Sequence, residues 1–180
     1  MGISETTTPD ESPVAGGAAT GAGTRDSADQ MQLVTFELGG ECFAVDIHAV
    51  REITRLMEIT RVPKSPEEIA GVINLRGNIV PVVELRKKFG FPDAGSCDQT
   101  RIIVLEYGGR ETGFIVDRVL EVLRIDSSIV DSTPEVMGTV DAEFVRGIAR
   151  LERRLLIVLD LEKLFAELGL NDLEIPVDAA

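Results

Sequence analysis

Short runs of branched apolar residues, broken by pairs of glycine, dominate the hydrophobic pattern of this chain. Leu33–Leu38 is rich in β-forming residues and stops at Gly39-Gly40, and Glu41–Val45 then resumes the strand pattern. The same order recurs 69 positions later, as Arg101–Tyr107, Gly108-Gly109 and Glu111–Val116. A glycine pair between two such runs is a hairpin signal. The pattern therefore predicts two β-hairpins of the same design.

A second pair of similar segments follows the first. Gly71–Phe89, which reads GVINLRGNIVPVVELRKKF, aligns without a gap with Gly147–Phe165, which reads GIARLERRLLIVLDLEKLF, at an offset of 76. The glycine that opens each copy is expected to allow a backbone arrangement that a side chain would oppose. Self-similarity of this kind predicts two related units in tandem. The first offset then matches Val50 with Val119, Glu52 with Glu121 and Ile53 with Val122.

Helical patterns are few and short. Four apolar residues in 161–168 follow the i, i+3, i+4, i+7 spacing of an amphipathic helix, and Gly169 is a natural residue to end it. Ser65–Glu68 forms a capping box with proline at the first helical position, which predicts a turn or two of helix ending at Gly71. Asp141 offers a similar start.

Strands of this length, joined by glycine turns, indicate small barrels or a sandwich. We predict a mainly β fold of two tandem units, built as small barrels or a sandwich, with a few short helices. Residues 1–30 are expected to be a disordered tail and 171–180 a C-terminal tail, with interleaved subdomains at approximately 31–98 and 99–170. Units of this size are near the lower limit for an independent core, so the two should share apolar surface along a seam or cleft.

Composition narrows the functional classes. The formal net charge of −13 argues against a nucleic-acid-binding protein, which needs a basic face to displace counterions. The chain has neither an apolar run long enough to span a bilayer nor a signal peptide, so we expect a cytoplasmic protein without direct membrane insertion. The two cysteines, Cys42 and Cys97, are too few for a disulfide framework and are interpreted as cytosolic thiols.

Catalytic motifs are missing from the sequence. The single histidine, His48, has no second ligand at a metal-binding spacing, and neither cysteine belongs to a recognisable cysteine–histidine motif. The glycine pairs do not match a phosphate-binding loop. We therefore expect a protein that is not an enzyme and that uses no metal or other cofactor.

The two copies differ most where one reads Asn74-Leu75-Arg76-Gly77. This stretch is expected to be a turn that presents Arg76 at the surface end of a strand. Pro81 follows inside an apolar strand and should lie at an edge or bulge, because proline cannot donate to a ladder. Two interpretations stay open: Arg76 belongs to a partner-binding site, or it pairs with Glu52 or Glu84 and only holds the turn.

These residues also carry a resemblance to a known family. The Asn-Leu-Arg-Gly segment followed by Ile-Val-Pro-Val-Val-Glu-Leu-Arg resembles the signature of the CheW-type chemotaxis coupling proteins. The resemblance covers about residues 32–168 and includes Val45-Asp46-Ile47, Val50-x-Glu52-Ile53 and Gly113–Val119.

The resemblance implies two packed SH3-like five-stranded β-barrels within a CheW-like domain at 31–170. It also implies a non-enzymatic scaffold, recruited to membrane receptor arrays, between the chemoreceptor cytoplasmic signalling tip and the CheW-like regulatory domain of the histidine kinase CheA. A module of a pilus or other non-flagellar chemosensory pathway remains the alternative. The partner-binding residues implied by the resemblance and by the repeat are Val50, Glu52, Ile53, Asn74, Arg76, Gly77, Val116 and Val119.

Overall fold

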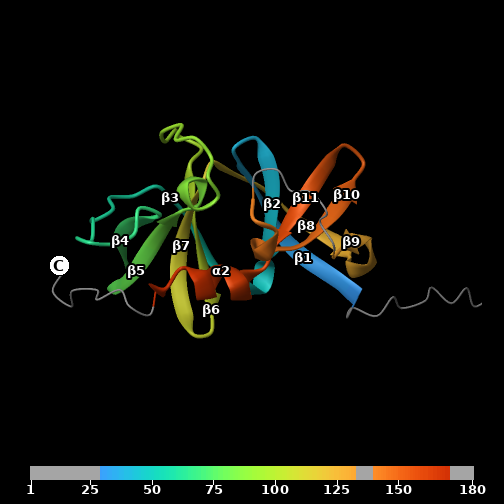
Figure 1. The fold of residues 1–180 in the computed structure, drawn as a ribbon. Coiled ribbons are helices and arrows are strands. Elements are labelled where there is room, and N and C mark those ends of the chain that lie inside the picture. Colours follow the sequence, from blue (N-terminus) through green and yellow to red (C-terminus); the bar gives the residue numbers. More distant parts are fainter. Residues whose placement is uncertain (1–28, 133–139, 171–180) are drawn as a thin grey trace, which may run out of the picture.

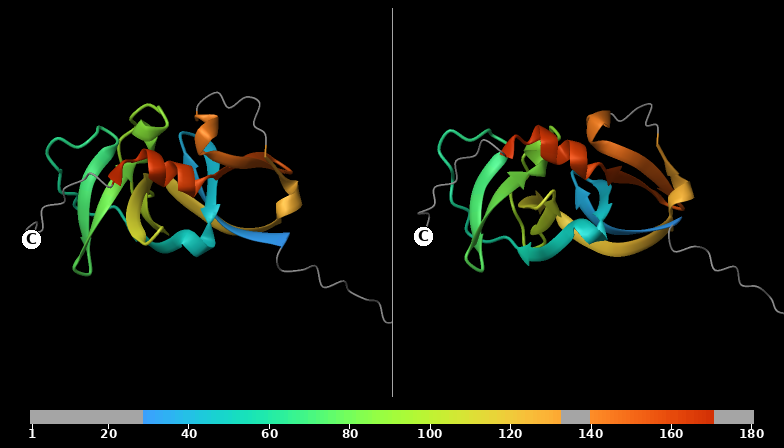
Figure 2. Two further views of the ribbon diagram at one scale, coloured as in Figure 1. Left: turned by 60° about the horizontal axis from the view of Figure 1, so that its bottom comes forward. Right: turned by 90° about the horizontal axis from the view of Figure 1, so that it is seen from below.

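The computed structural model describes residues 29–132 and 140–170. Most of the expected N-terminal tail and the whole of the expected tail 171–180 lie outside the described residues. Two twisted sheets curl into two barrel-like bodies that lie side by side (Figures 1 and 2). The predicted mainly β fold with two barrel-like subdomains is confirmed. None of the helices in the described ranges has the length and apolar character needed to cross a bilayer.

The six-stranded sheet is ordered β8-β1-β2-β11-β10-β9, and the five-stranded sheet β3-β6-β7-β5-β4. The strands of the first sheet are β8 (Arg118–Asp126), β1 (Gln30–Leu38), β2 (Glu41–Asp46), β11 (Arg154–Leu159), β10 (Val145–Leu151) and β9 (Val130–Asp131). Those of the second are β3 (Val50–Arg55), β6 (Arg101–Tyr107), β7 (Arg110–Val116), β5 (Asn78–Glu84) and β4 (Ile69–Leu75). The α-helices are α1 (Leu85–Lys88) and α2 (Leu161–Glu167), and the 3₁₀ turns are η2 (Ile47–Ala49), η3 (Ser127–Ile129) and η4 (Ala142–Phe144).

The duplication seen in the sequence is a duplication of topology. If β1 to β5 of the first repeat correspond to β6, β7, β8, β10 and β11 of the second, the order β8-β1-β2-β11-β10 becomes β3-β6-β7-β5-β4. Register agrees as well, since Val50 faces Leu105 while Val119 faces Phe36, and Ile53 faces Ile103 while Val122 faces Val34. Each sheet therefore combines the N-terminal hairpin of one repeat with three corresponding strands of the other, and the first sheet also contains the short β9.

The sheets thus divide the chain differently from the sequence halves 31–98 and 99–170. The first sheet takes residues 30–46 and 118–159, whereas the second takes residues 50–116. The ladders β1–β8, β2–β11, β3–β6 and β5–β7 all join one half to the other. Among the described residues, the pairings within either half are hairpins, the short β9–β10 pairing and the isolated bridge between Thr60 and Val72.

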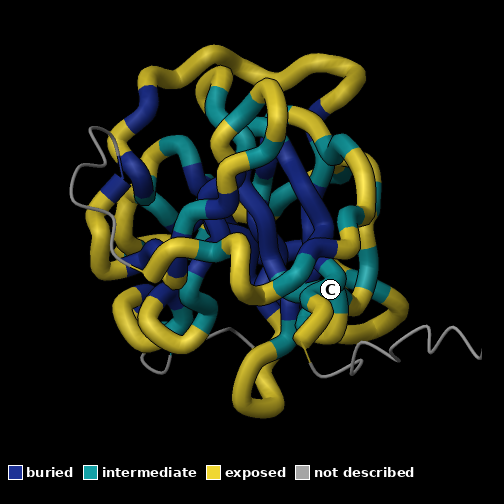
Figure 3. Tube along the Cα trace, turned by 90° about the vertical axis from the view of Figure 1, so that its right-hand side faces the viewer, coloured by how far each residue is buried: buried dark blue, intermediate teal, exposed yellow. Residues whose placement is uncertain are grey.

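The hydrophobic core has three parts. One cluster lies within the first sheet, around Leu33 and Leu156, and one within the second, around Ile73 and Ile102. The third and largest draws buried residues from both sheets, among them Phe43 and Phe114, and fills the junction between the barrels. Many strands are therefore buried on both faces, which explains their continuous apolar runs, and the buried trace passes through the middle of the molecule (Figure 3).

Each C-terminal helix of a repeat reaches across this junction. Phe89, just after α1, stacks on Phe43 with ring centroids 5.7 Å apart, and Phe165 of α2 lies 5.7 Å from Phe114. Phe89 and Phe165 are the residues that close the two aligned segments of the sequence. The shared phenylalanine therefore packs one barrel against the other in both repeats.

Steric contacts explain why both aligned segments begin with glycine, at Gly71 and Gly147. A Cβ on Gly71 would lie 2.2 Å from the carbonyl oxygen of Thr60, and one on Gly147 would lie 2.8 Å from that of Asp131. Gly71 also has a positive φ of 146°. Both glycines thus admit a neighbouring backbone segment that any side chain would displace.

Other local predictions had mixed outcomes. The amphipathic helix is confirmed as α2, and Gly169 has the left-handed φ of 54° expected after a helix. The helix predicted from Ser65 to Gly71 is wrong, because residues 65–68 make only a turn and Ile69 already begins β4. The placement of Pro81 at a sheet edge is also wrong, since β5 lies between β7 and β4. The β5–β7 ladder covers only Val82–Glu84, so the proline stands just outside it.

A partly buried ion pair ties the second repeat to the first. Arg86 in α1 donates from Nε to Oδ1 of Asp117 over 2.7 Å and from Nη2 to Oδ2 over 2.6 Å. The backbone N–H of Gly39, in the β1–β2 turn, donates to the same carboxylate over 2.9 Å. Partial burial raises the pKa of Asp117, but the hydrogen bonds from Arg86 and Gly39 outweigh it, so the pKa lies below its ordinary value.

Asp117→Asn is expected to lower the free energy of unfolding by about 2 kcal/mol near neutral pH, because it removes charge-assisted hydrogen bonds at a partly buried site. Because the pKa of Asp117 is lower in the folded protein than in the unfolded chain, the ionised carboxylate stabilises the fold at pH values above the unfolded pKa of about 3.9. This stabilisation is lost as the pH falls through the pKa of Asp117 in the folded protein. Urea unfolding of both forms should therefore give a constant difference above about pH 5 that shrinks towards zero in acid. A difference that grows on acidification would contradict this assignment.

Candidate interaction surface

The predicted site residues of the first repeat gather around β3 and the β4–β5 turn. We call Val50, Glu52, Ile53 and Arg76 the β3 patch. Side chains of β3 alternate between half-buried and exposed positions, so Val50 packs against the shared core cluster while Ile53 is 41% exposed. Nη2 of Arg76 lies 3.1 Å from Oε1 of Glu52, which joins the turn to the strand. The patch therefore combines an apolar anchor with a charged pair.

The turn itself explains the other two predicted residues. Arg76 and Gly77 both have positive φ, 52° and 87°, as a tight two-residue hairpin turn requires. The side-chain oxygen of Asn74 accepts a hydrogen bond from the Gly77 N–H over 2.8 Å. Asn74 and Gly77 thus shape the turn, and Arg76 is the residue that the turn presents.

The pairing with Glu52 left open by the sequence is present, whereas Glu84 pairs with Lys87 instead. The Arg76 side chain is 80% exposed, however. An ion pair at such an exposed position contributes little to stability. Arg76 is therefore available at the surface while being held in a defined direction.

The second barrel carries a corresponding surface on β8 that sequence reasoning only partly identified. We call Val119, Glu121, Val122, Arg154 and Leu155 the β8 patch. Val122 and Leu155 are 53% and 57% exposed, and Arg154 pairs with Glu121 as Arg76 pairs with Glu52. Val119 packs against the same shared cluster as Val50.

Arg154 was missed because the gap-free alignment matches Arg76 with Glu152. Leu75 pairs with Asn78 and Leu151 with Arg154, so the two turns correspond. The arginine of the second repeat stands at the last position of its turn instead of the first central one. The repeat of the β-strand residues, which matches Ile53 with Val122, was the signal that pointed to this surface.

Val116 does not belong to either patch. Its side chain is completely buried in the shared core cluster. It alternates along β7 with Ile115, which is half-buried, so its inward position follows from the strand period. The prediction of a partner contact at Val116 is therefore corrected to a core role.

The described residues do not offer an arrangement for nucleophilic or metal chemistry. His48 Nδ1 bonds to Asp46, and no hydrogen bond in the described ranges joins it to either cysteine. Burial raises the pKa of the Cys42 thiol, whereas a backbone hydrogen bond from Gln99 and the Thr100 hydroxyl lower that of the exposed Cys97. No cluster of three or more His, Cys, Asp or Glu side chains in the described part of the chain could hold a metal ion.

Residues 32–169 match the family model described as the CheW-like domain. The chain belongs to the CheW-like domain family. Its relatives include the chemotaxis protein CheW of Treponema pallidum, 34% identical over 81% of this chain and 88% of the relative, and that of Klebsiella aerogenes, 38% identical over 78% and 86%. The crystal structure of the scaffolding protein TtCheW from Thermoanaerobacter tengcongensis matches with a TM-score of 0.69 and 40% identity, covering 73% of this chain and 84% of that one.

The range matched by the family model spans most of the described residues. The matched range contains both barrels and therefore both patches. The Asn-Leu-Arg-Gly turn, Pro81 and the paired glycines lie within it. The family assignment thus rests on the part of the chain that forms the packed core.

Proposed function

We propose that this protein is a non-enzymatic adaptor that couples chemoreceptors to the histidine kinase CheA in chemotaxis signalling. The relatives named above are chemotaxis proteins, and the matching crystal structure is that of a scaffolding protein, which favours chemotaxis over a pilus-type pathway. The observation that carries the proposal is the exposed β3 patch on one barrel together with a counterpart on the other.

The partners we propose are the CheW-like regulatory domain of CheA and the cytoplasmic signalling tip of a chemoreceptor. Ile53 supplies an exposed apolar contact and Arg76 an ionic one, and Val50 of the same strand packs against the shared core cluster. An amphipathic helix and a barrel surface are both known kinds of partner for such patches. The protein would act at the cytoplasmic side of membrane receptor arrays.

Two non-identical barrels allow two partners to be held together. Attachment of one partner raises the effective concentration of the other, so modest pairwise affinities suffice in an ordered array. Signal transfer then requires a change in the relative positions of the partners and no covalent step.

Ile53→Ala and Arg76→Ala are expected to weaken the ternary complex with a CheA regulatory-domain fragment and a receptor signalling fragment. Truncating an apolar anchor at an interface typically costs about 2 kcal/mol and a rim charge well under about 1 kcal/mol, so Ile53→Ala should weaken binding more. Co-sedimentation and isothermal titration calorimetry measure the effect. Thermal unfolding should change little, because both side chains are exposed in the free protein.

Ile129→Ala is the matched control, since Ile129 is also 41% exposed but lies in η3, outside both patches. It should leave binding unchanged. Arg76→Ala protein that melts at a much lower temperature while its folded fraction binds normally would identify Arg76 as a structural clamp. That result would remove it from the proposed site.

A further inference from the structure

The segment that connects β3 to β4 forms a positively charged pocket in an acidic protein. The pocket has a volume of about 520 Å³ and lies between this connection and α1. Its lining includes three cations, Arg61, Lys64 and Lys87, and a single carboxylate, that of Glu67. Arg61 and Lys64 are exposed, and neither forms an ion pair with another described residue. The pocket therefore has an excess of positive charge, although the net charge of the whole chain is −13.

Backbone contacts hold this connection in shape. Thr60 and Val72 exchange two backbone hydrogen bonds, of 2.9 and 2.8 Å. The Ser65 hydroxyl donates to the carbonyl oxygen of Val62 over 2.8 Å, which closes a turn around Lys64. Lys64 has a positive φ of 63°, a conformation that residues other than glycine rarely adopt. The backbone that carries the cations is thus already arranged before a ligand binds.

Apolar side chains lie between the cations. The lining also contains Val62, Pro63, Pro66 and Ile69, and both prolines are exposed. A small inorganic anion would meet only the cations, whereas an acidic peptide segment with apolar residues would also remove the exposed prolines from water. The lining therefore favours an acidic peptide segment as the ligand.

The C-terminal end of α2 lies beside this pocket. Nζ of Lys88 is 3.7 Å from Oε1 of Glu167 and 3.9 Å from Oε1 of Glu68, and the Lys88 side chain is only 10% exposed. The residue that precedes Lys88 and the residue that precedes Glu68 both line the pocket. Because Glu167 is the last residue of α2, the chain leaves this helix at the edge of the pocket.

The sequence that follows α2 has the matching chemistry. Residues 171–180 read NDLEIPVDAA and contain three acids, Asp172, Glu174 and Asp178, with no lysine or arginine. Leucine, isoleucine, proline and valine stand between these acids. Ten extended residues reach up to about 33 Å, several times the width of a pocket of this volume. The segment is therefore long enough to lie along the pocket.

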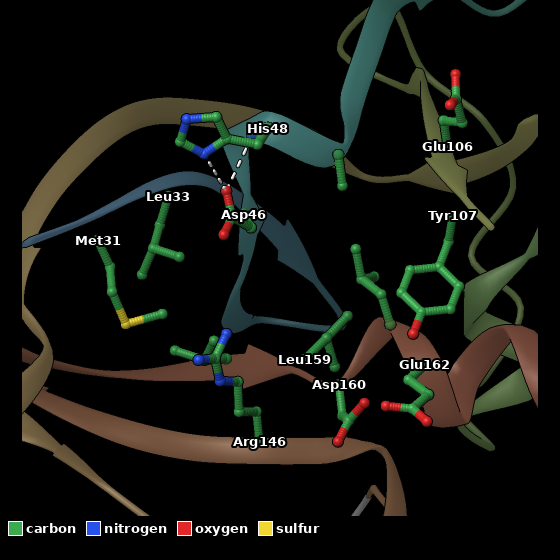
Figure 4. A pocket seen from close by; sticks show the side chains of 13 residues that line it. Met31, Leu33, Asp46, His48, Glu106, Tyr107, Arg146, Leu159, Asp160 and Glu162 are labelled. Carbon is green, nitrogen blue, oxygen red and sulfur yellow. Dashed lines mark hydrogen bonds and ion pairs between the residues drawn. The ribbon is translucent and has the colours of Figure 1, made fainter. Parts of the chain in front are cut away.

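Charge distinguishes this pocket from the one shown in Figure 4. That pocket, of about 470 Å³, is similar in size and is lined by four carboxylates and a single arginine, Arg146. It lies at the start of α2, since Asp160, Leu161 and Glu162 belong to its lining. A segment with three carboxylates would be repelled there, so charge and position along α2 both select the pocket beside α1.

We propose that residues 171–178 of this chain bind in the positively charged pocket. Their carboxylates would face Arg61, Lys64 and Lys87, and their apolar side chains would cover the prolines. Exposed ion pairs are weak singly, but a segment tethered beside its site is present at an effective concentration of about millimolar. No residue of the β3 patch lines the pocket, so this intramolecular contact is additional to the proposed adaptor function.

NMR spectra of the ¹⁵N-labelled full chain test the contact from both sides. Neutralising the segment should shift the amide signals of residues 61–67 and Lys87, and this triple variant is Asp172→Asn/Glu174→Gln/Asp178→Asn. In the reverse experiment, Arg61→Gln/Lys64→Gln should shift the signals of residues 171–178. Unchanged signals in both experiments would overturn the proposal.

Arg150→Gln/Arg153→Gln is the matched control for the second experiment. Both arginines are exposed at the β10–β11 hairpin, outside the pocket, and the double variant makes the same change in net charge as Arg61→Gln/Lys64→Gln. It should leave the signals of residues 171–178 in place. Equal shifts in the control would show that the segment responds to net charge and not to this pocket.

A synthetic peptide of residues 171–180 measures how far the pocket is already filled. It should bind saturably to the triple variant and at least about tenfold more weakly to the unmodified chain, because the tethered segment competes with it. Added NaCl should weaken binding of the peptide to the triple variant, since screening reduces attraction between exposed charges. Equal affinity for the two forms would leave the pocket to an acidic segment of a partner and overturn the proposal.

Protein concentration separates the segment of the same molecule from that of a second copy. The shift differences between the unmodified chain and the triple variant should stay constant over about a tenfold range of concentration. Differences that grow with concentration would assign the occupant to a second copy. Shifts of the pocket signals that arise only with phosphatidylglycerol vesicles, with no effect of the triple variant, would assign it to an anionic membrane surface. Either result would contradict binding within one chain.

Discussion

Fragments 31–98 and 99–170 are expected to be unfolded when separate and to fold together when mixed. Alone, the first fragment keeps the hairpins β1–β2 and β4–β5 and the single bridge between Thr60 and Val72, and β3 has no neighbour. An isolated hairpin is marginally stable at best in water. The four ladders that join the hairpins into sheets, and the shared core cluster, all require both fragments.

Far-UV circular dichroism and amide dispersion in NMR spectra measure the outcome. Each fragment should show little β signal, and an equimolar mixture should recover the spectrum of the intact chain with cooperative unfolding. A nick within the β6–β7 turn, at Gly108-Gly109, serves as a comparison. It interrupts the β6–β7 hairpin and leaves the other strands of each repeat connected to one another. Cooperative unfolding of either fragment by itself would contradict the strand exchange between repeats.

Phe43→Ala is expected to lower the free energy of unfolding by about 3–5 kcal/mol, the usual range for removing a buried phenylalanine. Phe43 is completely buried in the cluster between the barrels. Its ring lies 5.8 Å from Phe36, 5.7 Å from Phe89 and 6.3 Å from Phe91. Truncation therefore removes contacts to both barrels at once.

Thermal unfolding should show a drop of about 10 °C or more for a domain of this size. Phe43→Leu, which retains most of the apolar volume, should recover much of the loss. Tyr107→Ala is the control, because Tyr107 also contacts an aromatic ring but is 40% exposed. A similar loss for Tyr107→Ala and Phe43→Ala would mean that the cluster between the barrels is no more important than the surface.

The candidate surface was predictable to the extent that it lies on strands. The repeat matched Ile53 with Val122, and both side chains are exposed, but the sequence did not separate exposed Ile53 from the half-buried Val50. Val116 failed because a strand inside this molecule is covered on both faces, so alternation along β7 does not lead to solvent. Arg154 was not predicted, because the gap-free alignment matches Arg76 with Glu152 and does not show which position of a turn carries the arginine.

Around β4, contacts with other strands override the local sequence preference for a helix. The capping box at Ser65–Glu68 has the residues of a helix start, yet the bridge between Thr60 and Val72 and the pairing with β5 draw the chain into a strand. These pairings involve residues that lie outside the four-residue capping box. A preference read over four residues could not anticipate it.

By itself, the sequence determined the strands, the two glycine hairpins, the duplication and the family, because each depends on residue types at short and regular spacing. Only the tertiary structure decided which strands are neighbours. Two repeats of this kind could form two separate barrels or exchange their hairpins, and the same apolar runs suit both arrangements. The exchange is chosen by long-range ladders such as β1–β8 and β2–β11 and by the phenylalanines that pack across the junction. The energy of those contacts depends on two segments that meet only in the folded protein, so it cannot be predicted from the residues of either segment alone.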